Sequence, residues 1–106
     1  MPLDGTQLDE VTQILSRAYE ILEGGWCQRH MQDYVGSYCI LGAISKVFTE
    51  NGCVPSINYH RARWRIEQAI EIDYGANVVS DFNDFPGRTK EEVLDVVAKA
   101  ISIGPR

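Results

Sequence analysis

The chain has 106 residues, of which 44% are hydrophobic and 24% charged, and its formal net charge is −5. This length suits one domain, and this composition is that of a soluble globular protein. The acidic balance argues against a general binder of nucleic-acid phosphates, which needs a basic surface, and it suits a protein that meets a basic partner.

Cysteine usage and the N-terminal residues indicate the compartment. The three cysteines, Cys27, Cys39 and Cys53, are an odd number and form neither a Cys-x-x-Cys pair nor a zinc-type Cys/His cluster. Residues 1–5 lack the basic-then-apolar pattern of a signal peptide, and no apolar run approaches the ~18 residues of a membrane span. We therefore expect a cytoplasmic protein with reduced thiols, no membrane segment, no metal and no cofactor.

The first helix is predicted over residues 6–23. Its apolar side chains recur at helical spacing and form one stripe, namely Leu8, Val11, Leu15, Ala18 and Leu22. Asp4 or Thr6 is expected to cap its start, and Gly24-Gly25 to end it. Residues 26–36 show little periodicity, and we expect only a short helical turn around Arg29–Tyr34.

The least polar stretch, residues 37–50, predicts the second helix, over 38–50. Its apolar residues cover most of the cylinder, which is typical of a central helix. Ser37 is the expected N-cap, and Asn51-Gly52 the stop. Gly42 and Ala43 are small, so we expect a neighbouring backbone to approach closely there.

Two further helices are predicted over 57–74 and 90–102. Ser56 caps the first of these, and Gly75 ends it. Thr89 and Glu92 form a capping box at the start of the other. Between them, residues 76–88 read as an irregular loop pinned by the inward-facing rings of Phe82 and Phe85. The expected fold is an all-α single domain, residues 1–106, with four main helices.

Several short motifs follow one another along the chain: Gly25-Trp26-Cys27-Gln28, then Asp33 and Gly36, Tyr38-Cys39-Ile40-Leu41-Gly42-Ala43, Phe82-Asn83-Asp84, and Thr89-Lys90-Glu91-Glu92-Val93. Their order resembles that in a family of unknown function among small bacterial, largely actinobacterial, and phage proteins. The resemblance covers residues 12–101. This chain departs from the family at two positions. It has Phe82 where the family more usually has Trp. It has Arg29 after Gln28, where the family often has Gly, and this second change puts a tight backbone approach at that turn in doubt. The resemblance implies the helical fold, but it does not imply any particular activity.

Six residues are the candidate binding site. Each lies in a turn or loop next to an anchoring aromatic residue, or at the start of the second helix: Trp26, Gln28, Asp33, Cys39, Asn83 and Asp84. We expect them to meet at one pole and line a shallow polar pocket, where free amides at the helix N-terminus favour an anion or a polar ligand. The competing interpretation is that these groups satisfy one another and lock the loops.

Two other kinds of site compete with this one. Cys39, in the first turn of the predicted central helix, has the setting of a stabilised thiolate, with His30 or His60 as base and Asn83 or Asp84 to orient it. A small buried cysteine is the simpler interpretation. Residues 59–65 carry three arginines, a tyrosine and a tryptophan, which resembles a nucleic-acid patch, but nearby Glu67 and Glu71 favour a salt-bridged face.

We therefore expect a small cytoplasmic binding or regulatory protein rather than an enzyme. Its partner is expected to be a protein, and a phage-derived protein acting on a host or defence component fits this description. A Cys39-dependent or metal-assisted enzyme and a nucleic-acid-associated accessory protein remain as alternatives.

Overall fold

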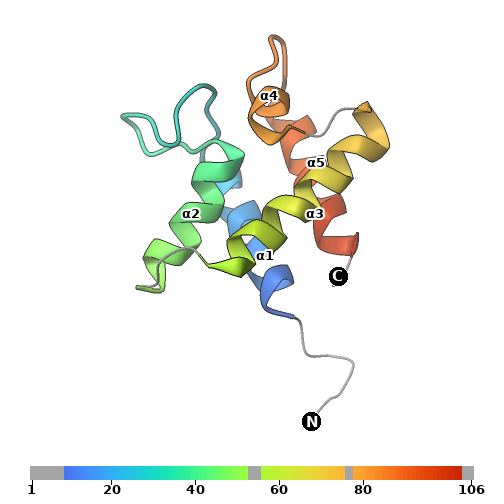
Figure 1. Cartoon of the computed structure of the whole chain (residues 1–106). Helices are drawn as coiled ribbons and strands as arrows, with labels where there is room; N and C mark the ends of the chain where they lie inside the picture. Colours follow the sequence, from blue (N-terminus) through green and yellow to red (C-terminus); the bar gives the residue numbers. More distant parts are fainter. Residues whose placement is uncertain (1–8, 53–55, 76–77, 104–106) are drawn as a thin grey trace.

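The computed structural model describes residues 9–52, 56–75 and 78–103, and within these ranges it is all-α with no strand (Figure 1). Five helices follow one another in the described part of the chain: α1 (Glu10–Gly24), α2 (Ile40–Glu50), α3 (Ile57–Tyr74), α4 (Val79–Asn83) and α5 (Lys90–Ile103). The all-α prediction is confirmed. Residues 76–88 are not irregular throughout, because the short helix α4 lies inside them. The helical turn expected around Arg29–Tyr34 is absent: residues 28–31 form bends, Gln32 makes an isolated bridge with Tyr38, and residues 34–35 form a turn.

The arrangement of the helices corrects the choice of residues 38–50 as the central helix. Helices α1 and α3 each contact all the other long helices, whereas α2 packs mainly on α1, with smaller contacts to α3 and α4. Part of the apolar circumference of α2 is covered by a loop instead of a helix. Its outer side carries Lys46, Thr49 and Glu50, which are half-buried or exposed.

The core is built from the predicted apolar stripes. Side chains with no exposed surface come from each long helix: Leu15 and Leu22, Ile44, Ile66 and Ile70, and Val93 and Val97. Phe82 of α4 is also buried, as expected, but Phe85 is 58% exposed. The prediction that Phe85 tucks inward is therefore wrong, since α4 ends before it.

Helix caps agree with local sequence rules in most places. The hydroxyl of Ser56 accepts the Asn58 amide, and Gly75 is left-handed with φ of 77°. In the capping box the Thr89 amide donates to Glu92 and the Glu92 amide to the Thr89 hydroxyl, at 3.0 and 3.1 Å. Both caps were predicted.

Helix α1 starts later than predicted. Its N-cap is Asp9, whose carboxylate accepts the amide and the hydroxyl of Thr12 at 2.9 and 2.8 Å. The expected caps, Asp4 and Thr6, lie outside the described residues. The choice of Asp9 follows from its further partner, Arg65 of α3, which no local pattern reveals. None of the described helices has the length and apolar character needed to cross a membrane.

Candidate functional site

The loop of residues 25–39 is closed on itself by backbone hydrogen bonds. The Tyr38 amide donates to the Gly25 carbonyl, and the Cys27 amide donates to the Tyr38 carbonyl, both at 3.0 Å. Further along, the Cys39 amide donates to the Met31 carbonyl at 3.3 Å. These bonds satisfy backbone groups that would otherwise need solvent, so the loop has a defined shape without regular secondary structure.

Gly42 allows this loop to lie on the first turn of α2. A Cβ atom at Gly42 would fall on the Met31 carbonyl oxygen, far inside van der Waals contact. The predicted close approach of a backbone at this glycine is confirmed. The loop, rather than another helix, is what approaches.

Asn83, at the end of α4, is 1% exposed and joins three segments of the chain. Its side-chain oxygen accepts the Trp26 indole N–H at 2.8 Å and the Ile40 amide at 3.1 Å. Its side-chain nitrogen donates to the Cys27 carbonyl at 3.2 Å and to a carboxylate oxygen of Asp84 at 2.9 Å. This side chain has thus used its hydrogen-bonding capacity, so it locks the loops and offers nothing to a ligand.

Gln28 and Asp84 extend this network. The Gln28 side-chain amide donates to the carbonyls of Asn83 and Phe85 at 3.1 and 3.0 Å, and Asp84 accepts the Arg29 amide at 2.8 Å. Arg29 has φ of 70° and is, in the part of the chain that the structure describes, the one residue other than glycine with positive φ. Arg29 adopts the left-handed backbone despite its Cβ, and the Asp84 carboxylate holds it there.

Cys39 is the N-cap of α2, a role that we had assigned to Ser37. Its sulfur accepts the Gly42 amide at 3.2 Å and lies 3.9 Å from the Met31 sulfur. Burial raises the pKa of the Cys39 thiol above its usual value, and the lowering effect of the Gly42 and Leu41 amides is smaller. The alternative of a stabilised thiolate is therefore not supported, and the simpler interpretation of Cys39 as a small, largely buried cysteine fits the structure.

The predicted free amides at this helix end are also taken. Asn83 occupies the Ile40 amide and Cys39 the Gly42 amide. Within the described ranges, no group of three His, Cys, Asp or Glu side chains is placed to hold a metal ion. The arrangement does not favour an anion or metal site here.

Asp33 does not join the other candidate residues. Its carboxylate accepts the amides of Val35 and Ser37 at 3.1 and 2.8 Å, so it shapes the turn at the tip of the loop. The network around Asn83 directly includes Trp26, Gln28 and Asp84, and Cys39 borders it. Five of the six candidates thus meet at one pole, and Asp33 does not take part.

A cavity of about 160 Å³ opens at this pole. Cys39, Asn83 and Asp84 are among its lining residues, together with Arg29, His30, Met31, Leu41, Val79 and Ser80. Trp26, Gln28 and Asp33 do not line it. Since the polar groups of Asn83 are already bonded, the cavity offers mainly apolar contact from Met31, Leu41 and Val79, and differs from the polar pocket expected.

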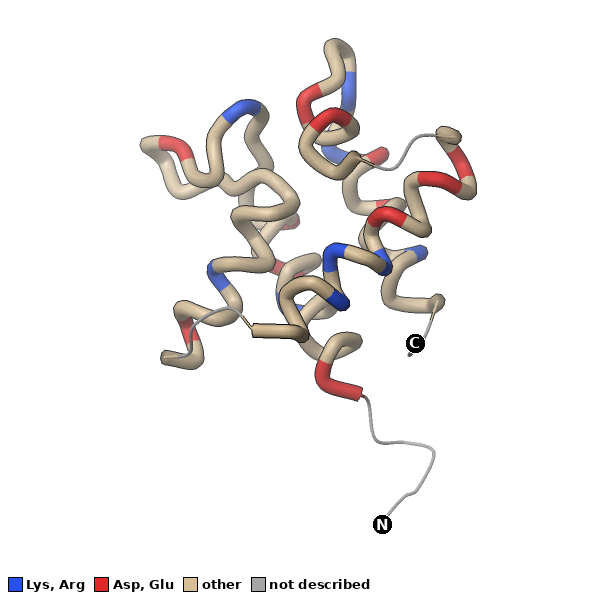
Figure 2. Tube along the Cα trace, viewed as in Figure 1, with Lys and Arg blue, Asp and Glu red and all other residues tan. Residues whose placement is uncertain are grey.

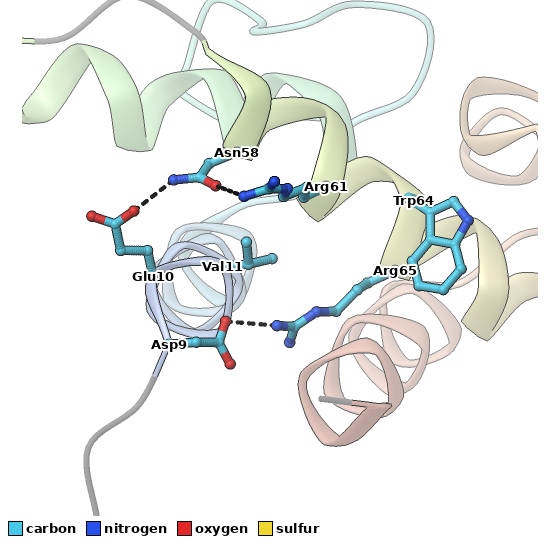
Figure 3. A pocket seen from close by; sticks show the side chains of 7 residues that line it. All are labelled: Asp9, Glu10, Val11, Asn58, Arg61, Trp64 and Arg65. Carbon is cyan, nitrogen blue, oxygen red and sulfur yellow. Dashed lines mark hydrogen bonds and ion pairs between the residues drawn. The ribbon is translucent and has the colours of Figure 1, made fainter. Parts of the chain in front are cut away.

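The salt-bridged face that the sequence favoured on α3 is present only in part: among the described residues Arg63 pairs with Glu67, and no arginine pairs with Glu71. Arg65 is 2% exposed and donates to Asp9 at 2.6 Å and to the Thr12 hydroxyl at 2.8 Å. Arg63 pairs with Glu67 at 3.5 Å, and Arg61 donates to Asn58 at 3.4 Å. A second cavity, of about 420 Å³, lies between α1 and α3, and the charges lining it balance: Asp9 and Glu10 against Arg61 and Arg65 (Figure 3).

The sequence analysis missed the apolar tip of the loop. Tyr34 and Val35 are 106% and 85% exposed, and Met31 is 50% exposed. Tyr34 and Val35 are neighbours in the chain, so together they present apolar surface to water, and contiguous apolar surface is what marks interaction sites. The sequence feature that could have predicted this exposed tip is the apolar pair Tyr34-Val35, which stands directly before Gly36 in a segment with no helical or strand periodicity.

Comparison with known proteins identifies a family. A family model described as a family of unknown function (DUF6197) matches residues 6–103. No curated protein and no solved structure matches the chain.

Proposed function

The chain belongs to DUF6197, a family of unknown function, and we propose that it is a non-enzymatic regulatory protein that binds a protein partner through the loop of residues 25–39. The observation that carries this proposal is the exposure of Tyr34 and Val35 at the tip of that loop. A large apolar side chain in water costs free energy, which burial against a partner recovers.

The rigidity of the loop supports the same function. Asp33 holds the tip, Tyr38 closes the base, and Asn83 ties the loop to α2 and α4. A loop that is ordered before binding loses less conformational entropy when the partner arrives. The network around Asn83 therefore supports a binding surface by positioning it.

The chemistry of the pole supports a binding rather than a catalytic role. The raised pKa of Cys39 leaves little thiolate at neutral pH, and a thiol attacks poorly. Asn83, the expected orienting group, has no bonding capacity left for a base. These observations favour a binding protein over the Cys39-dependent enzyme.

The test is affinity capture from a bacterial host extract with the Tyr34→Ser/Val35→Ser variant. We expect loss of the captured partner, by about tenfold or more, with an unchanged unfolding midpoint. The matched control is Ile57→Ser, which removes a 60% exposed apolar side chain at the start of α3. Equal capture by wild type and the loop variant, or equal loss in the control, would exclude the loop as the binding surface.

A further inference from the structure

Three aromatic rings surround one guanidinium where α3, α4 and α5 meet. The Cζ atom of Arg88 lies 3.9, 4.8 and 5.1 Å from the ring centroids of Phe82, Tyr74 and Phe85. The rings of Tyr74 and Phe82 also pack edge to face, with centroids 4.9 Å apart. We call Tyr74, Phe82, Phe85 and Arg88 the aromatic cluster.

The outer part of the aromatic cluster is open to solvent. Tyr74 and Phe85 are 41% and 58% exposed, whereas the Arg88 side chain is 9% exposed and is held by the Phe82 carbonyl and by Glu92. Each outer ring therefore has surface left after stacking on Arg88. Aromatic faces attract cations, as the position of Arg88 illustrates.

Acidic residues gather around the aromatic cluster. Residues 71–103 carry seven acidic and three basic side chains, a net charge of −4, while the rest of the chain is net −1. Figure 2 shows acidic positions along the last turns of α3 and on α4. Glu71 lies one turn before Tyr74 on the same side of α3, and Asp81 directly precedes Phe82.

The basic side chains of residues 71–103 do not neutralise Glu71 or Asp81. Arg88 pairs with Glu92, Lys99 pairs with Asp73, and Lys90 donates to the Glu23 carbonyl. Glu71 and Asp81 are exposed and make no ion pair with another described residue. Two carboxylates therefore remain available to a partner, that of Glu71 one turn from Tyr74 on α3 and that of Asp81 next to Phe82 on α4.

We propose that the aromatic cluster, together with Glu71 and Asp81, is a docking surface for an arginine- or lysine-rich segment of the partner protein. A cationic side chain of that segment stacks on the outer face of Tyr74 or Phe85, and the two carboxylates balance its charge. The aromatic cluster is joined to the loop of residues 25–39 at one point, where Gln28 donates to the Phe85 carbonyl at 3.0 Å. This inference rests on the proposed function and adds the chemistry of the partner.

The test uses a labelled nine-residue peptide of alternating Arg and Leu as the probe, with the same peptide carrying Glu in place of Arg as its counterpart. We expect the basic peptide alone to bind, to shift the amide resonances of residues 71–85 in a titration followed by NMR, and to bind less well as ionic strength rises. Glu71→Gln/Asp81→Asn should raise its Kd about fivefold. Phe85→Ser should also raise it, since an exposed ring is lost without a core contact.

The matched control is Glu20→Gln/Glu23→Gln, which removes two exposed charges from α1 and should change the Kd less than twofold. The inference is overturned if the acidic peptide binds equally well, if the control weakens binding as much, or if no amide near the aromatic cluster shifts at low salt. If the basic peptide fails while the Tyr34→Ser/Val35→Ser variant still loses its captured partner, the partner chemistry is wrong and the proposed function stands. If the peptide binds while that variant retains its captured partner, the docking surface stands and the role of the loop is rejected.

Discussion

The side-chain oxygen of Asn83 lies 2.8 Å from the indole nitrogen of Trp26, although 57 residues separate the two in the chain. The same oxygen accepts the amide of Ile40, at the start of α2. One buried side chain therefore holds the end of α4, the loop after α1 and the first turn of α2 in a fixed relation. The loop of residues 25–39 depends on this relation for its position.

Replacing Asn83 with Ala should lower the free energy of unfolding by about 2–4 kcal/mol, because the Trp26 N–H and the Ile40 amide both lose their acceptor. Urea denaturation followed by circular dichroism measures this loss. Asp84→Ala, at a residue only partly buried, should cost less. A loss below about 1 kcal/mol for Asn83→Ala would show that Asn83 is not the lock we describe.

Gly42→Ala should destabilise the protein by about 1–3 kcal/mol, because the new methyl group displaces the Met31 carbonyl from the first turn of α2. Gly24→Ala is the matched control. It lies in the last turn of α1, and a Cβ atom there meets nothing within 4 Å, so the substitution should be neutral or stabilise by up to about 1 kcal/mol. Similar unfolding midpoints for both variants would argue against the close packing of loop and helix.

Ile44→Ala should cost about 2–5 kcal/mol, because Ile44 has no exposed surface and its removal leaves a cavity between α2 and α1. Ile72→Ala removes the same atoms from a side chain that is 64% exposed. That variant should stay within about 0.5 kcal/mol of wild type. Comparable losses at the two positions would mean that α2 does not pack as the structure shows.

The described thiols should react slowly in the folded protein. Burial raises the pKa of Cys39 and, with the nearby charge of Asp33, that of Cys27. Alkylation at pH 7.5 should be slower than for a model thiol, and its rate should still be rising above pH 9.0, where the rate of the model thiol levels off. In denaturant, three labels are expected, the third on Cys53, which lies outside the described residues. Two missing labels would indicate a disulfide.

The raised pKa of Cys39 also sets the direction of a pH effect on stability. A raised pKa in the folded state favours the protonated thiol, so this contribution is complete below the pKa of the unfolded thiol and is lost as pH rises through the folded value. The free energy of unfolding should therefore decline in alkaline solution above about pH 9. Cys39→Ser, which keeps an acceptor for the Gly42 amide, should decline less steeply.

Asp9 should contribute to acid sensitivity. Burial alone would raise its pKa, but the two hydrogen bonds from Thr12 and the charge and hydrogen bond of Arg65 outweigh burial and lower it from 3.8. Its stabilising contribution is therefore present above the unfolded pKa and lost as pH falls through the folded value. Asp9→Asn should flatten the fall in unfolding free energy between about pH 5 and pH 2. Parallel pH curves for wild type and variant would contradict this account.

The sequence by itself determined the four long helices and most of their ends, but not the short helix α4. The third long helix was predicted over 57–74 and is observed there. The capping box of Thr89 and Glu92 forms as predicted. These features depend on residues within one or two turns of each other, so their interactions exist in any conformation that is locally helical. The apolar period likewise identified buried residues such as Leu15 and Ile44.

Only the tertiary structure decided which helix packs against which and what the polar residues do. The partners of Asn83 come from segments more than 40 positions away, namely Trp26, Cys27 and Ile40. The cap at Asp9 depends on Arg65, 56 positions on. For Cys39 the sequence favoured a small buried cysteine but left an activated thiol open, and only its burial in the folded chain decided between the two. A long-range hydrogen bond requires packed helices to hold both groups in place. Whether a polar side chain is bonded within the protein or stays free for a ligand is therefore decided by the packing of the helices.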